Sequence, residues 1–174
     1  MSAVAHVTDH ALVVLILELR GESFAIETSQ VREILDPGSI TAVPGADRAV
    51  DGLINVRGRV VPLADLRLLF GMTREDAGED ARIVVIEVPI DGVPTTVGIR
   101  ADKVNEVTEL AATSLEATPR IGLRWQQEFI TCIGKRNGDF IAVLDMGRIF
   151  ERLMRNGKGT AAPVLVAAQA DADP

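Results

Sequence analysis

Two aspartates each follow an apolar, strand-like stretch and could form a pair of catalytic carboxylates. They are Asp65, after Ala64, and Asp145, after Leu144. In aspartic proteases two such carboxylates share one proton. That chemistry needs a small hydroxyl residue and a glycine after the aspartate, whereas Leu66 and Met146 stand there. We therefore expect each aspartate to cap the N-terminus of a short helix by accepting backbone N–H bonds.

The sequence has few histidine and cysteine residues that could act in catalysis or bind a metal ion. The two histidines, His6 and His10, lie near the N-terminus with Asp9 between them, a spacing that a metal ion could use. A solvated tail is the simpler interpretation. The single cysteine, Cys132, lies within an apolar stretch and is expected to be a small buried core residue. No Ser-His or Cys-His pair exists outside the N-terminal stretch, so we predict that the protein is not an enzyme and has no cofactor.

The charge balance excludes two classes of partner. Eighteen Lys and Arg residues face 25 Asp and Glu residues, for a net charge of −7. Binding to a nucleic-acid backbone or to an anionic membrane surface relies on basic patches, so neither is expected. The longest apolar run covers residues 11–17, far short of the roughly 20 residues that span a bilayer. We predict a cytoplasmic protein that does not insert into a membrane.

The dominant pattern is of short Val- and Ile-rich stretches separated by tight-turn residues, which indicates a mostly β fold. Four such pairs predict β-hairpins, at residues 12–19 with 24–27, 53–56 with 59–63, 83–90 with 93–100, and 129–135 with 140–144. Weaker strands are expected at 40–43 and 106–110. Short helices are predicted at 28–35, 64–70 and 145–155, the last having the best apolar stripe.

The chain also repeats itself. The segment 31–34 resembles 104–107, and 63–66 resembles 143–146, at similar offsets along the chain. Two units of five strands each are the natural inference, and short twisted strands tend to close into small barrels with a groove between them. A single sandwich is the alternative. We expect one domain at 11–155, between a tail at 1–10 and a tail at 156–174. Within the domain, barrels are expected near 11–71 and 81–145 and a helix at 145–155. An exchange of strands between the two barrels is left open.

A sixteen-residue stretch resembles the signature of the CheW family. It reads Gly52-Leu53-Ile54-Asn55-Val56-Arg57-Gly58-Arg59-Val60-Val61-Pro62-Leu63-Ala64-Asp65-Leu66-Arg67. Further matches, at the spacing of the family, extend the similarity over residues 12–153. They include 24–26, 31–34 and 43–44 upstream, and 97–99 and 144–145 downstream. Asp51, where the family commonly has a basic residue, is a departure.

The resemblance implies paired SH3-like barrels without enzymatic activity. CheW-like proteins couple the histidine kinase CheA to chemoreceptors in bacterial chemosensory arrays. One barrel docks on the regulatory domain of the kinase, and the groove between the barrels receives the cytoplasmic tip of a methyl-accepting receptor. An adaptor of a paralogous system, such as twitching motility, is one alternative. A small-ligand-binding or protease-like double barrel is another.

Matching family positions supply the candidate site residues, and core packing is the alternative role for Val31, Ile99, Val104 and Val107. The receptor-binding groove is predicted to use Val31, Glu33, Arg57, Ile99, Val104 and Val107, with Glu33 and Arg57 as an ion pair. The kinase contact is predicted to use Ile40, Val43, Gly52 and Ile54. A second, ring-closing contact is assigned to Arg120 and Ile121.

Overall fold

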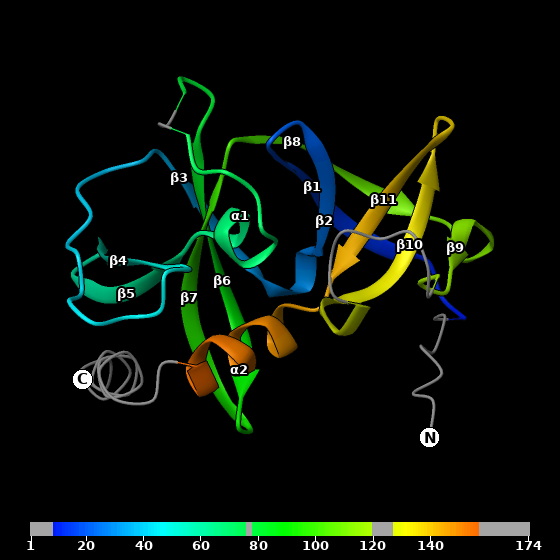
Figure 1. Ribbon diagram of the computed structural model, residues 1–174. Helices are drawn as coiled ribbons and strands as arrows, with labels where there is room; N and C mark the ends of the chain where they lie inside the picture. The colour runs from blue at the N-terminus through cyan, green and yellow to red at the C-terminus, as the bar shows by residue number, and fades with distance from the viewer. Residues whose placement is uncertain (1–8, 76–77, 120–126, 157–174) are drawn as a thin grey trace.

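The computed structural model describes residues 9–75, 78–119 and 127–156, and these form two β-sheets with few helices (Figure 1). The first sheet has the order β3 (Val31–Leu35), β6 (Arg82–Ile90), β7 (Val93–Ala101), β5 (Arg59–Ala64) and β4 (Val50–Val56). The second has the order β8 (Lys103–Leu110), β1 (Leu12–Leu19), β2 (Glu22–Glu27), β11 (Asp139–Leu144), β10 (Ile130–Arg136) and β9 (Leu115–Glu116). The prediction of a mostly β fold is confirmed.

Two short helices lie where the sheets meet, as Figure 1 shows. They are α1 (Leu66–Leu69) and α2 (Met146–Asn156), and their buried residues pack into the core between the sheets. Three 3₁₀ turns complete the described elements: η1 (Thr28–Gln30), η2 (Ala112–Ser114) and η3 (Gln127–Phe129). Both helices begin directly after a strand end, as predicted, so each is fixed at the boundary between the sheets.

All four predicted hairpins form, and their turns explain why. In each turn two consecutive residues have positive φ, the backbone that two-residue hairpin turns require. The second residue is always glycine, and the first is a longer side chain held near +50°. The four turns are Arg20-Gly21, Arg57-Gly58, Asp91-Gly92 and Asn137-Gly138.

The sheets do not follow the two halves of the chain. Hairpin β1–β2 pairs with β8 and β11 of the second half, and hairpin β6–β7 pairs with β3 and β5 of the first half. The boundaries of 11–71 and 81–145 therefore describe neither sheet, because each sheet exchanges one hairpin with the other. Turn residues predict only which neighbouring strands pair as hairpins. The exchanged pairings join strands that are far apart in the sequence, so turn residues do not predict them.

Each sheet encloses a core of its own, and a third core joins the two sheets. In β1, Val14 and Ile16 face the core of the second sheet, while Leu15 and Leu17 face the shared core. Strands buried on both faces are apolar throughout instead of alternating, which explains the long apolar runs in the sequence. The edge strands of the first sheet, β3 and β4, contribute to the same core. Leu35 of β3 packs against it, and Ile54 and Val56 of β4 belong to it, so the first sheet curls on itself.

Two local predictions were wrong. The segment 28–35 is not a helix: Thr28–Gln30 form a 3₁₀ turn and Val31–Leu35 form β3. Its apolar residues fit a helical spacing, but pairing with β6 satisfies their backbone groups. Residues 40–43 form no strand and contribute a single bridge, between Thr41 and Leu53. The weak strand expected at 106–110 is the longer β8.

The two sheets repeat one arrangement. In each, an edge strand (β3 or β8) lies beside an exchanged hairpin (β6–β7 or β1–β2). That hairpin pairs in parallel with the hairpin that the sheet does not exchange (β4–β5 or β10–β11). The edge strands β3 and β8 contain the two similar segments 31–34 and 104–107. Their residues Val31 and Val104 are both half-buried against the shared core, so the repeat places two equivalent edges around it.

Candidate partner-binding surfaces

The two aspartates that could have formed a catalytic pair are helix caps. Asp65 is fully buried and accepts a hydrogen bond from the backbone N–H of Arg67 at the start of α1. Asp145 accepts one from the N–H of Arg148, at 3.1 Å, at the start of α2. The prediction of capping is confirmed. Asp65 also binds the Arg67 guanidinium with both oxygens, at 2.8 and 2.9 Å.

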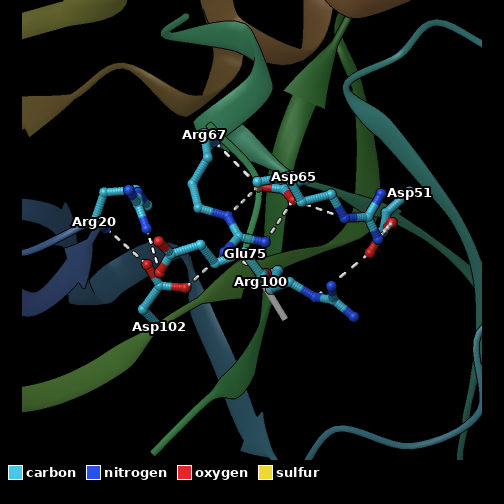
Figure 2. Close-up of polar contacts among 8 residues, drawn as sticks. Arg20, Asp51, Asp65, Arg67, Glu75, Arg100 and Asp102 are labelled. Carbon is cyan, nitrogen blue, oxygen red and sulfur yellow. Dashed lines mark hydrogen bonds and ion pairs between the residues drawn. The ribbon is translucent and has the colours of Figure 1, made fainter. Parts of the chain in front are cut away.

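Arg67 is the centre of a buried ionic cluster, drawn in Figure 2. Its guanidinium also donates to Asp102 at 2.9 Å and to the carbonyl of Glu75 at 3.2 Å. Asp102, between β7 and β8, in turn accepts from the backbone N–H of Arg20 in the β1–β2 turn, at 2.7 Å. The hydrogen bonds to Asp65 raise the pKa of Arg67 above its ordinary value, against the opposing effect of burial. The cluster therefore ties α1 to both sheets.

Asp51, the departure from the family pattern, belongs to the same region. Its side chain is almost fully buried on β4, with Arg74 at 2.5 Å and Arg100 at 3.4 Å. Figure 2 shows Asp51 and Arg100. Two arginines thus balance an acidic residue where a basic one is common. Asp65, Arg67 and Asp51 are almost fully buried, so this part of the cluster holds the fold together, while Arg74 lies at its exposed margin with 47% of its side chain accessible.

Glu33 and Arg57 form the ion pair that the resemblance implied. Arg57 donates from Nε to Oε2 of Glu33 at 2.9 Å. Arg57 lies in the β4–β5 turn with 81% of its side chain exposed, while Glu33 on β3 is 24% exposed. Since β3 and β4 are opposite edges of the first sheet, the pair bridges the two edges of the curled sheet. It leaves a cationic side chain displayed at the surface.

The predicted apolar receptor contacts fall into three environments. Val31 and Val104 are half-buried on the equivalent edge strands, against the shared core. Val107, also on β8, is 60% exposed. Ile99 on β7 is fully buried in the shared core, so its side chain has the packing role that the sequence left open. Three of the four valine and isoleucine candidates therefore remain accessible on β3 and β8.

Three of the residues assigned to the kinase contact lie together on the first sheet. Ile40 is half-buried and packs against the core of that sheet, where Ile54 is buried. Gly52 permits this approach, because a Cβ there would lie 2.4 Å from the carbonyl oxygen of Thr41 and 2.8 Å from Ile40 Cγ2. Val43 is half-buried in the loop that follows. Ile40 and Val43 are thus the partly accessible members, Gly52 allows the close approach of Ile40 and Thr41, and Ile54 lies in the core against which Ile40 packs.

Other predicted residues are buried or lie outside the residues that the structure describes. Cys132 is fully buried, as expected, and desolvation, with a smaller effect of Glu27, raises its pKa to about 11. Arg120, Ile121 and His6 lie outside the described residues, as do most of both predicted tails. Within the described part of the chain, no group of His, Cys, Asp and Glu residues could hold a metal ion. There is also no helix there with the length and apolarity needed to cross a bilayer.

Sequence reasoning missed a second ion pair, between Glu106 on β8 and Arg136 at the end of β10, 2.5 Å apart. The signal that could have found it was the repeat itself, since Glu106 occupies the position in 104–107 that Glu33 occupies in 31–34. It also missed the exposed apolar residues near these pairs. The solvent exposure of these side chains depends on which face of a strand is covered by a core. The arrangement of the three cores decides this, and the sequence pattern alone does not show it.

Known proteins share both the sequence pattern and the fold. The chain is 29% identical over 131 residues to the chemotaxis protein CheW of Helicobacter pylori, covering 75% of this chain and 76% of that protein. It is 25% identical to the CheW protein of Klebsiella aerogenes over 135 residues, covering 78% and 79%. The crystal structure of the scaffolding protein TtCheW from Thermoanaerobacter tengcongensis superposes with a TM-score of 0.72 at 27% identity, covering 80% of this chain and 92% of that one.

One shorter match comes from another protein. Protein PilI of Pseudomonas aeruginosa is 33% identical over 67 residues, 38% of either chain. The family model described as the CheW-like domain matches residues 13–154, nearly the whole described region. The chain therefore belongs to the CheW-like domain family.

Proposed function

We propose that this protein is a non-enzymatic scaffold that couples the cytoplasmic tips of chemoreceptors to the histidine kinase CheA in a bacterial chemosensory array. The observation that carries the proposal is the Glu33–Arg57 pair, displayed where the edges of the first sheet meet, in a chain whose CheW-like domain spans residues 13–154. The protein would act at the inner face of the membrane through its receptor partner, with no contact of its own to lipid.

The receptor would dock as an amphipathic helix across the edge strands. Val31, Val104 and Val107 supply apolar contacts on β3 and β8, and the ion pair supplies a polar rim. Arg57 is the most exposed member and lies in a rigid two-residue turn. The turn fixes the backbone of Arg57, and the hydrogen bond to Glu33 orients its guanidinium, as expected for an anchoring residue.

The kinase would contact the first sheet beside the signature hairpin. Ile40 and Val43 offer the accessible apolar surface there, and the close approach at Gly52 holds their segment against β4. Changing Val43 to Asp should weaken binding of the kinase regulatory domain and leave receptor binding unchanged. Val93→Asp, at an exposed site where β7 begins, is the matched control. Equal effects of both changes would contradict this assignment.

Reconstitution tests the coupling itself. Receptor-containing membranes and the kinase are mixed with or without this protein, and kinase autophosphorylation is measured. We expect activation only when the protein is present, and we expect Glu33→Ala and Arg57→Ala variants to activate poorly while melting near the wild-type temperature. An exposed pair contributes only about 0–1 kcal/mol to stability. Unfolded variants would show that the pair is structural, and unchanged coupling by folded variants would exclude its role at the site.

A paralogous chemosensory system is the second candidate, favoured by the partial match to PilI. Pull-down of this protein with the chemotaxis kinase and with the kinase of the second system, in parallel, separates the two. Exclusive capture of the second kinase would transfer the scaffold role to that system.

A further inference from the structure

The second sheet carries its own version of the Glu33–Arg57 pair. Arg136 donates to Glu106 at 2.5 Å, and the residues are 29% and 53% exposed. Glu106 lies on edge strand β8, and Arg136 lies at the β10–β11 turn on the other side of the sheet. The first pair likewise joins edge strand β3 to the β4–β5 hairpin, although Arg57 is the first residue of its turn and Arg136 is the last residue of β10.

The likeness extends to the backbone. On β3 the pairing with β6 shifts between Val31 and Glu33, and on β8 the pairing with β1 shifts between Val104 and Glu106. A β-bulge changes the direction in which the following side chain points. In both sheets the bulge precedes the glutamate and follows a valine that is half-buried in the shared core. The two glutamates are therefore positioned by one repeated device.

Exposed apolar side chains are repeated as well. Ile34 and Val107, each directly after its glutamate, are 43% and 60% exposed. Val60 and Phe140, each the second residue after the glycine of its turn, are 44% and 62% exposed. These four residues are most of the exposed large hydrophobic residues in the described part of the chain. Selection for folding does not account for such a coincidence, because exposed apolar groups contribute little to a core.

The second pair adds little to stability yet keeps its charge. Partly exposed ion pairs contribute weakly to folding. The hydrogen bond from Arg136 holds the pKa of Glu106 below its ordinary value, so the carboxylate is ionised at neutral pH. Glu106 is also the more exposed of the two glutamates. Its carboxylate oxygens remain available to a partner that approaches β8.

We infer that Glu106, Arg136, Val107 and Phe140 form a second docking position, which receives the second helix of the same receptor hairpin. The inference rests on the proposed function. Glu106 lies on β8 with Val104 and Val107, and Val107 belongs both to the proposed receptor surface and to the second position, so the two positions share a strand. Two copies of one surface around a shared core fit a partner that presents two similar helices, and an antiparallel helical hairpin does so.

Binding of the two-helix receptor tip to the full chain tests the inference. The probe is the recombinant cytoplasmic hairpin of a chemoreceptor encoded in the same genome, and its affinity is measured by calorimetry. Glu106→Gln and Phe140→Ser should each weaken binding about tenfold, the scale of a lost interface anchor. Glu128→Gln, which removes the partly exposed partner of Arg152, is the matched control and should leave affinity unchanged. Exchanging the charges in a Glu106→Arg, Arg136→Glu double variant should retain the fold but not the affinity.

The possible outcomes distinguish a failure of the second docking position from a failure of the proposed receptor-binding function. If Glu33→Gln weakens binding and the changes at Glu106 and Phe140 do not, the second position is wrong while the receptor-binding function stands. If the wild-type chain does not bind the hairpin, both fail. Thermal melts accompany each variant, and a loss of affinity that only follows a loss of folded protein would also overturn the second position.

Discussion

At the scale of single residues, the most consequential side chain is Arg67. It is almost fully buried between Asp65 and Asp102, and each neighbour depends on it for charge balance. Replacement by Met would remove both guanidinium hydrogen bonds from the buried Asp65 carboxylate and leave Arg74, 3.9 Å away, beside it. Removing one partner of a buried ion pair typically costs about 3–5 kcal/mol. We expect Arg67→Met to lower the free energy of unfolding by that amount in urea denaturation.

Arg57→Met is the matched control for this prediction. It also removes an arginine from an ion pair, but at an exposed site, where the loss should be about 0–1 kcal/mol. Similar losses for the two variants would show that burial does not decide the strength of these pairs.

Cys132 gives a prediction about chemical reactivity instead of stability. Burial raises the pKa of its thiol to about 11, and only the thiolate attacks thiol reagents. At pH 8 roughly one molecule in a thousand carries the thiolate. The folded protein should therefore fail to react with Ellman's reagent until denaturant is added. Rapid labelling of folded protein at pH 8 would place this cysteine outside the core.

Residue roles were predictable from sequence only where they depended on neighbours in the chain. Capping by Asp65 and Asp145 followed from what comes next along the sequence. The ionic partner Asp102 did not, because it lies 35 residues from Arg67 and reaches it only through the packing of the sheets. The Glu33–Arg57 pair was predicted through the family resemblance, and its repeat at Glu106 was missed.

At the scale of elements, tight-turn chemistry predicted the hairpins well and apolar spacing predicted the edge strand poorly. Arg57-Gly58 and Asn137-Gly138 have positive φ, and residues that tolerate this conformation identify such turns. Segment 28–35 carries no turn signal of that type at its end. Its conformation is decided by β6, which is far away in sequence.

Gly52 tests how the segment carrying Ile40 is held. A Cβ at this position would lie 2.4 Å from the carbonyl oxygen of Thr41, and φ is +151°. We expect Gly52→Ala to destabilise the protein by about 2–4 kcal/mol, because the bridge between Thr41 and Leu53 must separate. Gly58→Ala has a positive φ but open space, so it should cost only about 1 kcal/mol. Urea denaturation measures both, and equal costs would contradict the close approach.

At the scale of the whole molecule, the exchanged hairpins make each half of the chain depend on the other. Residues 1–77 contain β1 to β5 without β6 and β7, the strands that join β3 to β5 in the first sheet. Residues 78–174 contain β8 to β11 without β1 and β2, the strands that join β8 to β11 in the second. The repeat in the sequence indicated two units, but the repeat alone could not show which hairpin completes which sheet.

Separate fragments provide the corresponding test. Isolated hairpins are marginally stable in water at best, and the core shared by the two sheets is also lost when the halves are apart. We expect fragments 1–77 and 78–174 each to give the narrow amide NMR spectrum of an unfolded chain. Mixed in equal amounts they should recover dispersed spectra, because each fragment supplies the central hairpin that the other lacks. If residues 78–174 folded alone, the second sheet would not need β1 and β2, and the exchange would be incidental to stability.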